Sequence, residues 1–498
     1  MHIVHIAAEL APIAKVGGLA DVVLGLSREL SWKKHDVDIL IPKYDCLDTS
    51  LVRDLNVDYH NLYSFYQGKW YPNTVWMGWV ENLKVYFLEP HHPRFFFNRG
   101  CYYGCEDDVE RFLYFSRAAI EFLYKRGIHP DVLHLHDWQT SAIGPLYREM
   151  YQQLGYTKPK VVATIHNLEY QGKCQPHELD FIGLSSTYFQ QADKLQDFVD
   201  PSLSNLLKGA IVYADVVTTV SPTYAEEVLT PEGGWGLDAI LREHRQKFFG
   251  ILNGVDYSYW NPEIDRYLPV HFSQREYPAN KKDHSTLDKK GLLKKQLRER
   301  LCLAEEHRPI VACITRLVPQ KGIELIRYAI EHIDDKKAQF ILLGSGSVPE
   351  INHEFYELKH RFADHLQVHI TLQHQEELAH LIFAGADMLI VPSLFEPCGL
   401  TQMIALKYGT VPIVRCTGGL ADTIFDVDYS NKSFEETNGY VFKDPDPAGL
   451  DSALDRAMHC WFDEPERWRR LMLNGMRTDY SWNRSSDRYI GLYHTPCK

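Results

Sequence analysis

Short apolar runs alternate with longer amphipathic stretches along nearly the whole chain. In the first half, the runs that predict buried strands cover residues 2–7, 36–42, 84–88, 131–135, 160–165 and 215–220. In the second half they cover residues 310–315, 339–344, 368–372, 387–392 and 411–415. Apolar runs of this length, separated by helix-length amphipathic stretches, are typical of βα units around a parallel sheet. The pattern therefore predicts an α/β protein with two doubly wound parallel sheets.

The two series of strands are separated by a stretch rich in turn-forming residues. It reads NGVDYSYWNPEIDRYLPVHF and is followed by DKKGLLKKQLRERL, a strongly charged helix candidate. A chain of 498 residues is also too long for a single hydrophobic core. We therefore expect a first domain over residues 1–255 and a second over residues 256–479, with the boundary near 255–265.

Composition excludes several classes of protein. Hydrophobic residues make up 45% and charged residues 24% of the chain, which are ordinary values for a folded globular protein. The net charge of −13 disfavours broad electrostatic binding of nucleic acid or anionic lipid, so any bound anion is held locally. Of the ten cysteines, even the closest pair, Cys101 and Cys105, lacks the spacing of a zinc site. We expect reduced thiols and no metal.

The amino-terminal residues predict no targeting signal. The stretch HIVHIAA resembles a buried strand and lacks the basic region and long apolar run of a signal peptide. No apolar run reaches the roughly 18 residues that a membrane span needs. We expect a cytoplasmic protein with no membrane or nucleic-acid partner, or a plastid protein if a targeting segment lies outside this sequence.

The pentapeptide GGLAD occurs twice, at residues 17–21 and 418–422, each time between a predicted strand and a predicted helix. In KVGGLAD, the amides of Gly17 and Gly18 can hold a phosphate while Lys15 adds positive charge. The repeat alone identifies no ligand, because these residues are common in such turns. The spacing of a P-loop is absent, and the GSG at 344–346 lacks the third glycine of a dinucleotide fingerprint, so no cofactor is expected.

Two motifs of the second half place charge at the ends of strands. In TRLVPQKG, Arg316 ends a strand and Lys321 precedes a helix, which suits a diphosphate; the alternative is a pair of solvated surface charges. In LFEPCGLTQM, the carboxylate of Glu396 can bind sugar hydroxyls or a developing positive charge, and the helix-start amides can meet phosphate. Cys398 has no base nearby in the sequence, so we expect it to pack in the core.

Two motifs of the first half place polar groups at strand ends in the same way. Asp137 in HLHDWQT and His166 in TIHNLEYQG each follow a strand, where side chains face a bound ligand. His134 and His136 alternate along one strand face, and we expect both to be satisfied core residues. Tyr170 is one of many aromatic residues on which a sugar can stack, although most of these rings will be core.

Taken together, the blocks resemble bacterial glycogen synthases and plant starch synthases, the glucosyltransferases that extend an α-1,4-glucan from a nucleotide-activated glucose. The resemblance spans essentially the whole chain and rests on the order KVGGLADV, HDWQT, TIHNLEYQG, VSPTYAEEV, GILNGVDYSYWNP, TRLVPQKGIELI, LFEPCGLTQM and TGGLADT. The opening 23 residues are most similar to the branch that contains plant starch synthases of classes III and IV.

The resemblance implies a GT-B fold, with two Rossmann-like domains facing across a cleft and a last helix within 480–498 that packs back on the first domain. The first domain is expected to bind the acceptor and the second the nucleotide sugar. The implied catalytic residues are Asp137, His166, Arg316, Lys321 and Glu396. The implied substrate-binding residues are Lys15, Gly17, Gly18, Asp21, Asn167, Tyr170, Gln171, Asn253, Ser345, His374, Cys398, Gly399, Leu400 and Thr401.

The chain departs from the wider family pattern at two positions. Ile404 stands where many retaining enzymes of this fold carry a second glutamate, an absence that synthases of this type share. His374 stands where relatives often have a tyrosine that stacks on adenine, which bears on the affinity for the base.

The implied reaction is transfer of glucose, with retention of configuration, from ADP-glucose or UDP-glucose to the non-reducing end of an α-1,4-glucan or maltooligosaccharide. One alternative is another enzyme of the same fold, such as a glucan phosphorylase or a sucrose-forming transferase. Phosphorylases are much longer and need a pyridoxal-phosphate lysine region that is not found here. A second alternative is a non-catalytic glucan-binding or granule-initiating protein, against which the intact Lys15, His166, Arg316, Lys321 and Glu396 argue.

Overall fold

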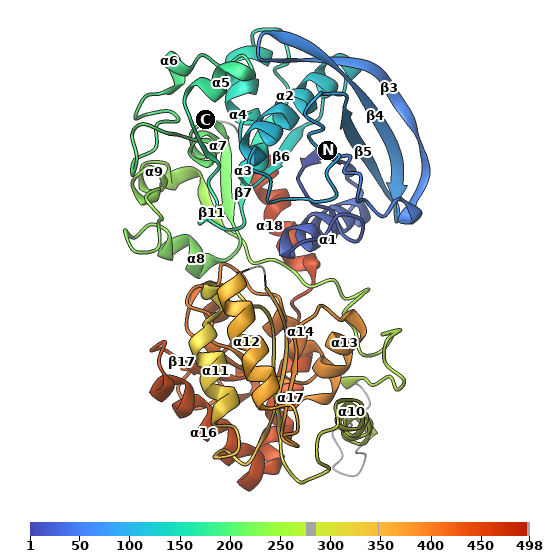
Figure 1. The fold of residues 1–498 in the computed structure, drawn as a ribbon, viewed down its shortest axis with the longest axis vertical. Helices are drawn as coiled ribbons and strands as arrows, with labels where there is room; N and C mark the ends of the chain where they lie inside the picture. The colour runs from blue at the N-terminus through green and yellow to red at the C-terminus, as the bar shows by residue number, and fades with distance from the viewer. Residues whose placement is uncertain (275–284, 347, 496–498) are drawn as a thin grey trace. The chain divides into compact units, whose positions relative to one another are not determined.

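A computed structural model describes residues 1–274, 285–346 and 348–495, and the chain divides into two compact units (Figure 1). Unit 1 combines residues 1–254 with the carboxyl-terminal segment that begins at Trp482, and unit 2 runs from Val255 to Ser481. None of the helices among the described residues combines the length and the apolar character that crossing a bilayer requires.

Unit 1 is built on a nine-stranded sheet with the order β11-β10-β7-β6-β1-β2-β5-β4-β3. The parallel strands are β1 (His2–Ile6), β2 (Asp36–Pro42), β5 (Leu83–Pro90), β6 (Val132–His136), β7 (Lys160–Ile165), β10 (Val216–Thr219) and β11 (Phe248–Gly250). The six strands expected in this half are confirmed. Strand β1 is flanked by β2 and β6, so the strand order changes direction between β1 and β6.

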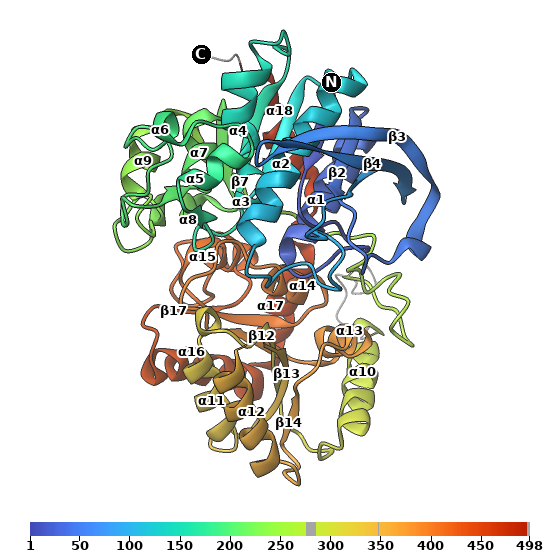
Figure 2. The same cartoon turned by 45° about the horizontal axis from the view of Figure 1, so that its top comes forward.

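The sheet continues beyond β5 as a long antiparallel hairpin that the apolar pattern did not predict. It is formed by β3 (Val52–Tyr66) and β4 (Lys69–Val80), and Figure 2 shows it at the outer edge of unit 1. Polar residues dominate the first half of β3, and three register shifts interrupt its pairing with β4. A bulged, solvent-facing strand at a sheet edge does not form an apolar run, and this explains the omission of β3. Strand β4 lies inside the sheet and does contain an apolar run, residues 75–80, which the prediction passed over.

The helices of unit 1 surround this sheet. They are α1 (Gly18–Trp32), α2 (Asp108–Arg126), α3 (Trp138–Ser141), α4 (Ile143–Leu146), α5 (His177–Phe181), α6 (Ser186–Phe189), α7 (Leu206–Tyr213), α8 (Pro222–Glu227), α9 (Asp238–Glu243) and α18 (Trp482–His494). The two-residue strands β8 (Lys173–Cys174) and β9 (Ser204–Asn205) form a separate ladder.

Unit 2 is a six-stranded, fully parallel sheet with the order β14-β13-β12-β15-β16-β17. Its strands are β12 (Ile310–Arg316), β13 (Gln339–Ser345), β14 (Val368–Thr371), β15 (Met388–Val391), β16 (Val411–Arg415) and the short β17 (Tyr440–Phe442), of which only β17 was not expected. Its helices are α10 (Ser285–Leu301), α11 (Ile323–Glu331), α12 (Pro349–Arg361), α13 (Glu376–Gly385), α14 (Thr401–Lys407), α15 (Gly418–Thr423), α16 (Pro447–Asp463) and α17 (Pro465–Arg477). The strand order changes direction between β12 and β15.

Each sheet therefore has one pair of neighbouring strands at which the strand order reverses, β1 and β6 in unit 1 and β12 and β15 in unit 2. Ligands of open α/β sheets bind outside the carboxyl ends of the strands at such a point. The motifs of the first half follow β1, β6 and β7, and those of the second half follow β12, β13, β15 and β16. The fold thus collects the predicted residues of each unit at the edge of the sheet where a ligand is expected.

The carboxyl-terminal helix α18 is held in unit 1 by close packing on α1 (Figure 1). A Cβ atom added at Gly25 of α1 would lie 2.1 Å from Nε1 of Trp482, the first residue of α18. Tyr493, near its end, is hydrogen-bonded to His134 of β6 at 2.8 Å. Gly25 is therefore needed for the close approach of the two helices.

We expect Gly25→Ala to lower the free energy of unfolding by about 1–3 kcal/mol, the usual cost of overpacking a core contact. The matched control is Gly291→Ala in α10, where no described atom lies within 4 Å of the added Cβ. There, removal of backbone freedom should stabilise the protein by about 0.5–1 kcal/mol. Thermal unfolding of both variants measures the difference, and equal melting temperatures would contradict the packing argument.

Candidate functional site

The glycine turn of unit 1 is built around a buried carboxylate. Glu9 lies three residues beyond β1 and is only 5% exposed. Its Oε2 accepts hydrogen bonds from the N–H groups of Val16 (2.8 Å) and Gly17 (3.0 Å), and its Oε1 accepts one from the hydroxyl of Tyr103 (2.8 Å). The Gly17 amide, expected to hold a phosphate, is therefore engaged by Glu9. Sequence analysis missed Glu9, and its place between a strand and a glycine turn was the available signal.

Positive charge stands at the outer side of the same turn. Lys15 Nζ lies 2.9 Å from Oδ1 of Asp21, which is in the first turn of α1, and both side chains are about one-third exposed. An ion pair this exposed contributes only about 0–1 kcal/mol to stability. Its effect is to orient the ammonium group, next to the exposed Gly18 at the helix start.

Asp137 joins the carboxyl ends of β6 and β7. Its Oδ1 accepts a hydrogen bond of 2.7 Å from the N–H of His166, and its φ of +57° with ψ of −174° lies in a strained region that residues other than glycine rarely adopt. Burial raises the pKa of Asp137 to about 7, and the charge of Glu9 adds to this, while the N–H groups of His166 and Asn167 lower it. This carboxyl group therefore titrates near neutral pH.

His166 is the outer member of a chain of three histidines. Its Nε2 lies 3.0 Å from Nδ1 of His136, and His136 Nε2 lies 3.0 Å from Nδ1 of His5. Burial lowers the pKa of His5 and His166 to about 3 and that of His136 well below its usual value. All three rings are therefore neutral at neutral pH, and each carries one N–H.

The surroundings of His5, the inner member of this row of histidines, determine which ring nitrogen of each histidine carries the proton. His5 Nε2 is buried and has no hydrogen-bond partner among the described residues. If the rings donated inward, this atom would carry a buried N–H with no acceptor, which is rare in proteins. If each ring donates outward instead, His5 Nε2 is unprotonated, and the single N–H of the His166 ring lies on its Nδ1. The chain therefore favours a neutral His166 with a hydrogen-bond donor at Nδ1.

The expected core role is confirmed for His134 and incomplete for His136. His134 bonds to the hydroxyl groups of Tyr493 (2.8 Å) and Thr164 (2.6 Å), which satisfies both ring nitrogens. His136 is equally buried but contacts the predicted site residue His166. Alternation along one strand gave no sign of this difference, because it depends on the pairing of β1, β6 and β7.

The nitrogens of His5, His134 and His136 lie within 4.8 Å of one another, a spacing that raises the question of a metal. His134 already uses both ring nitrogens, on Tyr493 and Thr164, and His136 uses both, on His5 and His166. A cation here would have to displace these hydrogen bonds. The hydrogen-bonded neutral chain explains the cluster better.

Asn253 and Gln171 lie in contrasting surroundings in unit 1. Asn253 is 5% exposed, and its Oδ1 has no hydrogen-bond partner within the described ranges, so a ligand can satisfy it. Gln171 donates to two backbone carbonyls at 3.0 Å and accepts from Asn205 at 2.6 Å. Its carboxamide is thus engaged by the scaffold, while Asn167 is half-buried and Tyr170 is 54% exposed.

The centre of the candidate site in unit 2 is a buried ion pair between Lys321 and Glu396. Lys321 Nζ donates to Oε2 of Glu396 at 2.6 Å, and the hydroxyl of Ser393 donates to the same oxygen at 2.8 Å. Glu396 is 5% exposed, and the side chain of Lys321 is 16% exposed. Lys321 follows β12 and Glu396 follows β15, the two strands that flank the change in strand order.

A glycine brings Lys321 close to the end of β15. Lys321 ends a short 3₁₀ turn, Pro319–Lys321, and Gly322 follows it with φ of +72°. A Cβ on Gly322 would lie 2.1 Å from the carbonyl oxygen of Pro392. Only glycine therefore permits both the left-handed backbone and the close approach that set the Lys321–Glu396 distance.

The second GGLAD turn supports the loop that carries Glu396. The N–H of Gly419 donates to the carbonyl of Glu396 at 3.0 Å, and a Cβ at Gly419 would lie 2.1 Å from the carbonyl oxygen of Cys398. The carboxamide of Gln402 donates to the carbonyls of Cys398 (3.1 Å) and Gly399 (2.9 Å). The side chain of Cys398 is buried, as expected for a residue that packs in the core, and its assignment to the substrate stays a prediction.

The remaining predicted residues of unit 2 lie at the ends of neighbouring elements. Arg316 is the last residue of β12, is exposed, and is paired in register with Ser345 of β13. Leu400 precedes α14, which Thr401 begins. His374, beyond β14, has a side chain that is 75% exposed and lies 2.9 Å from a carboxylate oxygen of Glu376.

We expect Asp137→Asn to gain stability relative to the unsubstituted protein as the pH rises. The pKa of Asp137 is raised from 3.8 to about 7, so between these values the folded chain holds a proton that the unfolded chain has released. The stability that this proton confers is lost with rising pH, whereas asparagine does not titrate and still accepts a hydrogen bond. Melting temperatures measured from pH 5 to pH 8 should diverge in favour of Asn. A difference independent of pH would contradict the assigned titration.

Comparison with known proteins gives a consistent result. Residues 2–243 match the family "Starch synthase catalytic domain", and residues 298–471 match "Glycosyl transferases group 1". The chain is 70% identical to the glycogen synthase of Protochlamydia amoebophila over 493 residues, or 99% of each chain. It is 46% identical to the probable starch synthase 4 of Arabidopsis thaliana, over 99% of this chain and 47% of that protein.

A solved structure extends this similarity to the fold. The catalytic domain of starch synthase IV from Arabidopsis thaliana, bound to ADP and acarbose, superimposes with a TM-score of 0.94 at 46% identity. The match covers 99% of this chain and 98% of that one.

Proposed function

The chain belongs to the bacterial glycogen synthase and plant starch synthase family, and we propose that it transfers glucose from ADP-glucose to the non-reducing end of an α-1,4-glucan with retention of configuration. It is a GT-B glucosyltransferase of glucan synthesis that uses a nucleotide-sugar donor and a glucan acceptor. The single observation that carries the mechanism is the Lys321–Glu396 pair at the carboxyl edge of β12 and β15. ADP as the nucleotide is supported by the ADP-bound starch synthase IV domain.

In the proposed mechanism, unit 2 stabilises the departing nucleoside diphosphate. The ammonium of Lys321 has three N–H donors, of which one is directed at Glu396, so two can reach phosphoryl oxygens. Arg316, at the end of the adjoining strand, adds a second cation. Each charge-assisted hydrogen bond contributes about 1.5–3 kcal/mol, enough to favour the leaving group without a cofactor. Ser345, His374, Leu400 and Thr401 are assigned to the nucleotide.

Unit 1 supplies the groups assigned to glucose and acceptor. His166 offers its backbone carbonyl and the N–H at Nδ1, which can donate to an oxygen of the substrate. Its pKa of about 3 excludes an imidazolium acid at neutral pH. Asp137 holds the His166 backbone, and Asn253 offers a buried acceptor. Lys15, Gly18, Asp21, Asn167 and Tyr170 complete the proposed contacts.

The reaction itself needs no separate base in this scheme. The acceptor's 4-hydroxyl attacks C1 of glucose on the face from which the diphosphate leaves, the C1–O bond to phosphate breaks, and the hydroxyl proton passes to the leaving phosphate oxygen. Glu396 Oε2 is held by Lys321 and Ser393, an arrangement suited to orienting the cation and a sugar hydroxyl. The main catalytic effect is then preorganised positive charge at the leaving group.

Two finer points belong to this proposal. The first is a preference for ADP-glucose over UDP-glucose as the donor. Because His374 stands in place of a stacking tyrosine, we also expect a lower affinity for the nucleotide base. The second is the cytoplasmic location that the sequence predicts.

The direct test supplies labelled ADP-glucose or UDP-glucose with a maltooligosaccharide primer. We expect a higher kcat/KM with ADP-glucose and new α-1,4 linkages at the non-reducing end, read by NMR of the product. A protein that holds the primer without lengthening it would refute the proposal. A lower kcat/KM with ADP-glucose than with UDP-glucose would refute the donor assignment alone.

Replacing Lys321, Glu396 or His166 by Ala should lower kcat roughly 10²- to 10³-fold, the usual effect of removing one group that stabilises developing charge. Glu396→Gln should lose less than Glu396→Ala, since its amide can still orient Lys321. The matched control is Arg300→Ala, which breaks an exposed ion pair with Glu377 elsewhere in unit 2. Melting temperatures distinguish a loss of catalysis from unfolding. Near-normal turnover in any of the three Ala variants would contradict the catalytic role assigned to that residue.

A further inference from the structure

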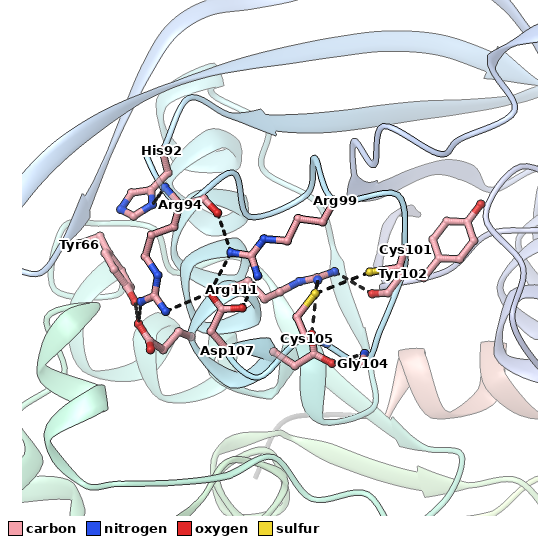
Figure 3. A network of polar contacts seen from close by, with 12 residues as sticks. Tyr66, His92, Arg94, Arg99, Cys101, Tyr102, Gly104, Cys105, Asp107 and Arg111 are labelled. Carbon is pink, nitrogen blue, oxygen red and sulfur yellow. Dashed lines mark hydrogen bonds and ion pairs between the residues drawn. The ribbon is translucent and has the colours of Figure 1, made fainter. Parts of the chain in front are cut away.

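Two cysteines lie within reach of each other in the segment between β5 and α2. Cys101 Sγ and Cys105 Sγ are 3.6 Å apart, and both residues are partly exposed (Figure 3). A disulfide brings its sulfur atoms to about 2 Å, so a small movement of the intervening Tyr102, Tyr103 and Gly104 suffices to join them. Gly104 has a φ of +92°, which turns the chain back between the two thiols.

A buried arginine makes the two thiols chemically different. Arg111 is fully buried and donates from Nη1 to Cys105 Sγ at 3.0 Å and from Nη2 to the carbonyl of Tyr102 at 2.7 Å. The pKa of Cys101 is raised by burial and by the neighbouring Cys105, and Arg111 partly offsets this. Because the guanidinium contacts the sulfur of Cys105 directly, we assign Cys105 as the attacking thiol and Cys101 as the second one.

The segment is fixed on both sides of the pair. On one side, the N–H of Gly100 donates to both carboxylate oxygens of Asp45 at 2.9 and 3.1 Å. On the other, Arg99 and Arg94 converge on the carboxylate of Asp107, as Figure 3 shows. Closure of the disulfide therefore moves mainly the residues between the two cysteines.

One of those residues holds the glycine turn. The hydroxyl of Tyr103 donates to Glu9, whose other oxygen holds the N–H groups of Val16 and Gly17. The hydroxyl of Tyr102 contacts the carbonyls of Cys46 (3.2 Å) and Ile13 (3.4 Å). A shift of the pair is thus transmitted through two tyrosines to the turn that carries Lys15.

We propose that Cys101 and Cys105 are a redox site, which a low-molecular-weight disulfide such as glutathione disulfide oxidises to a reversible intramolecular disulfide that loosens the glycine turn. The Cys105 thiolate attacks the oxidant, forming a mixed disulfide and releasing one glutathione thiolate. Cys101 loses its proton, attacks Cys105 Sγ and expels the second glutathione. The protein loses two electrons and two protons, and one glutathione disulfide becomes two glutathione thiols.

The chemistry of the site is tested by peptide mapping after incubation with glutathione disulfide. We expect the tryptic peptide of residues 100–111 to lose two hydrogens and to resist alkylation, and dithiothreitol to reverse both changes. Cys101→Ser should instead retain one glutathione on Cys105, whereas Cys105→Ser should gain little. Full alkylation of both thiols after oxidation, or preferential glutathione addition at Cys101, would overturn the proposal.

The link to the glycine turn is tested without reference to activity. Hydrogen exchange of the Val16 and Gly17 amides should accelerate several-fold on oxidation, as it should in reduced Tyr103→Phe, which lacks the hydroxyl. The control is Cys302→Ser, an exposed cysteine of unit 2, which should respond to oxidation like the unsubstituted protein. Unchanged exchange in the oxidised protein would overturn the link.

The expected effect of oxidation on catalysis rests on the proposed function, in which the glycine turn that carries Lys15 binds the substrate. The KM for ADP-glucose should rise several-fold in the oxidised protein and return on reduction, while Cys105→Ser, which gains little glutathione, keeps the reduced value under both conditions. An oxidised protein with accelerated exchange but an unchanged KM would refute the assignment of the turn to the substrate. The exchange result would still support the redox site.

Discussion

A carboxylate withdrawn from water must be satisfied by hydrogen bonds or by an opposite charge, and three such carboxylates organise the candidate site. Glu9 holds two amides of the glycine turn, Asp137 holds the backbone of His166, and Glu396 holds Lys321. Asp137 and Glu396 each meet a group from the loop after another strand, whereas Glu9 and its two amides lie within the single loop after β1. The requirement for a partner therefore fixes the positions of the loops that the function depends on.

The repeated GGLAD sequence serves two purposes with two backbone conformations, because Gly17 precedes α1 with φ of −147° whereas Gly418 begins α15 with φ of +44°. In unit 1 the turn wraps around Glu9 and leads Lys15 to the outside. In unit 2 the absence of a Cβ at Gly419 lets the turn lie against Cys398 and donate to the Glu396 carbonyl. The first copy lies at the proposed ligand, whereas the second supports the loop that carries Glu396 of the candidate site. The two copies therefore share a place between a strand and a helix, but not a backbone conformation.

Much of the fold and part of the site followed from the sequence. Buried parallel strands are apolar on both faces, so they form short apolar runs, and their spacing gave both sheets. The edge strand β3 escaped because its first half is polar and its pairing with β4 is interrupted by register shifts. Residues at strand ends such as Lys321, Glu396 and His166 were recognised because parallel topology places all such ends on one edge. Glu9 also follows a strand but was missed, whereas the support from Gln402 and the contact between His166 and His136 had no comparable signal.

The sequence by itself determined the two α/β units, the strand-end positions of the charged motifs and the family to which they point. These depend on local periodicity and on the order of motifs, both of which are properties of the chain before it folds. Only the tertiary structure decided which groups meet: His5 and His136 are 131 residues apart yet hydrogen-bonded, and Gly17 gives its amide to Glu9 instead of leaving it for a phosphate. Such contacts depend on strand register and on burial, which set both the partners and the protonation of each group.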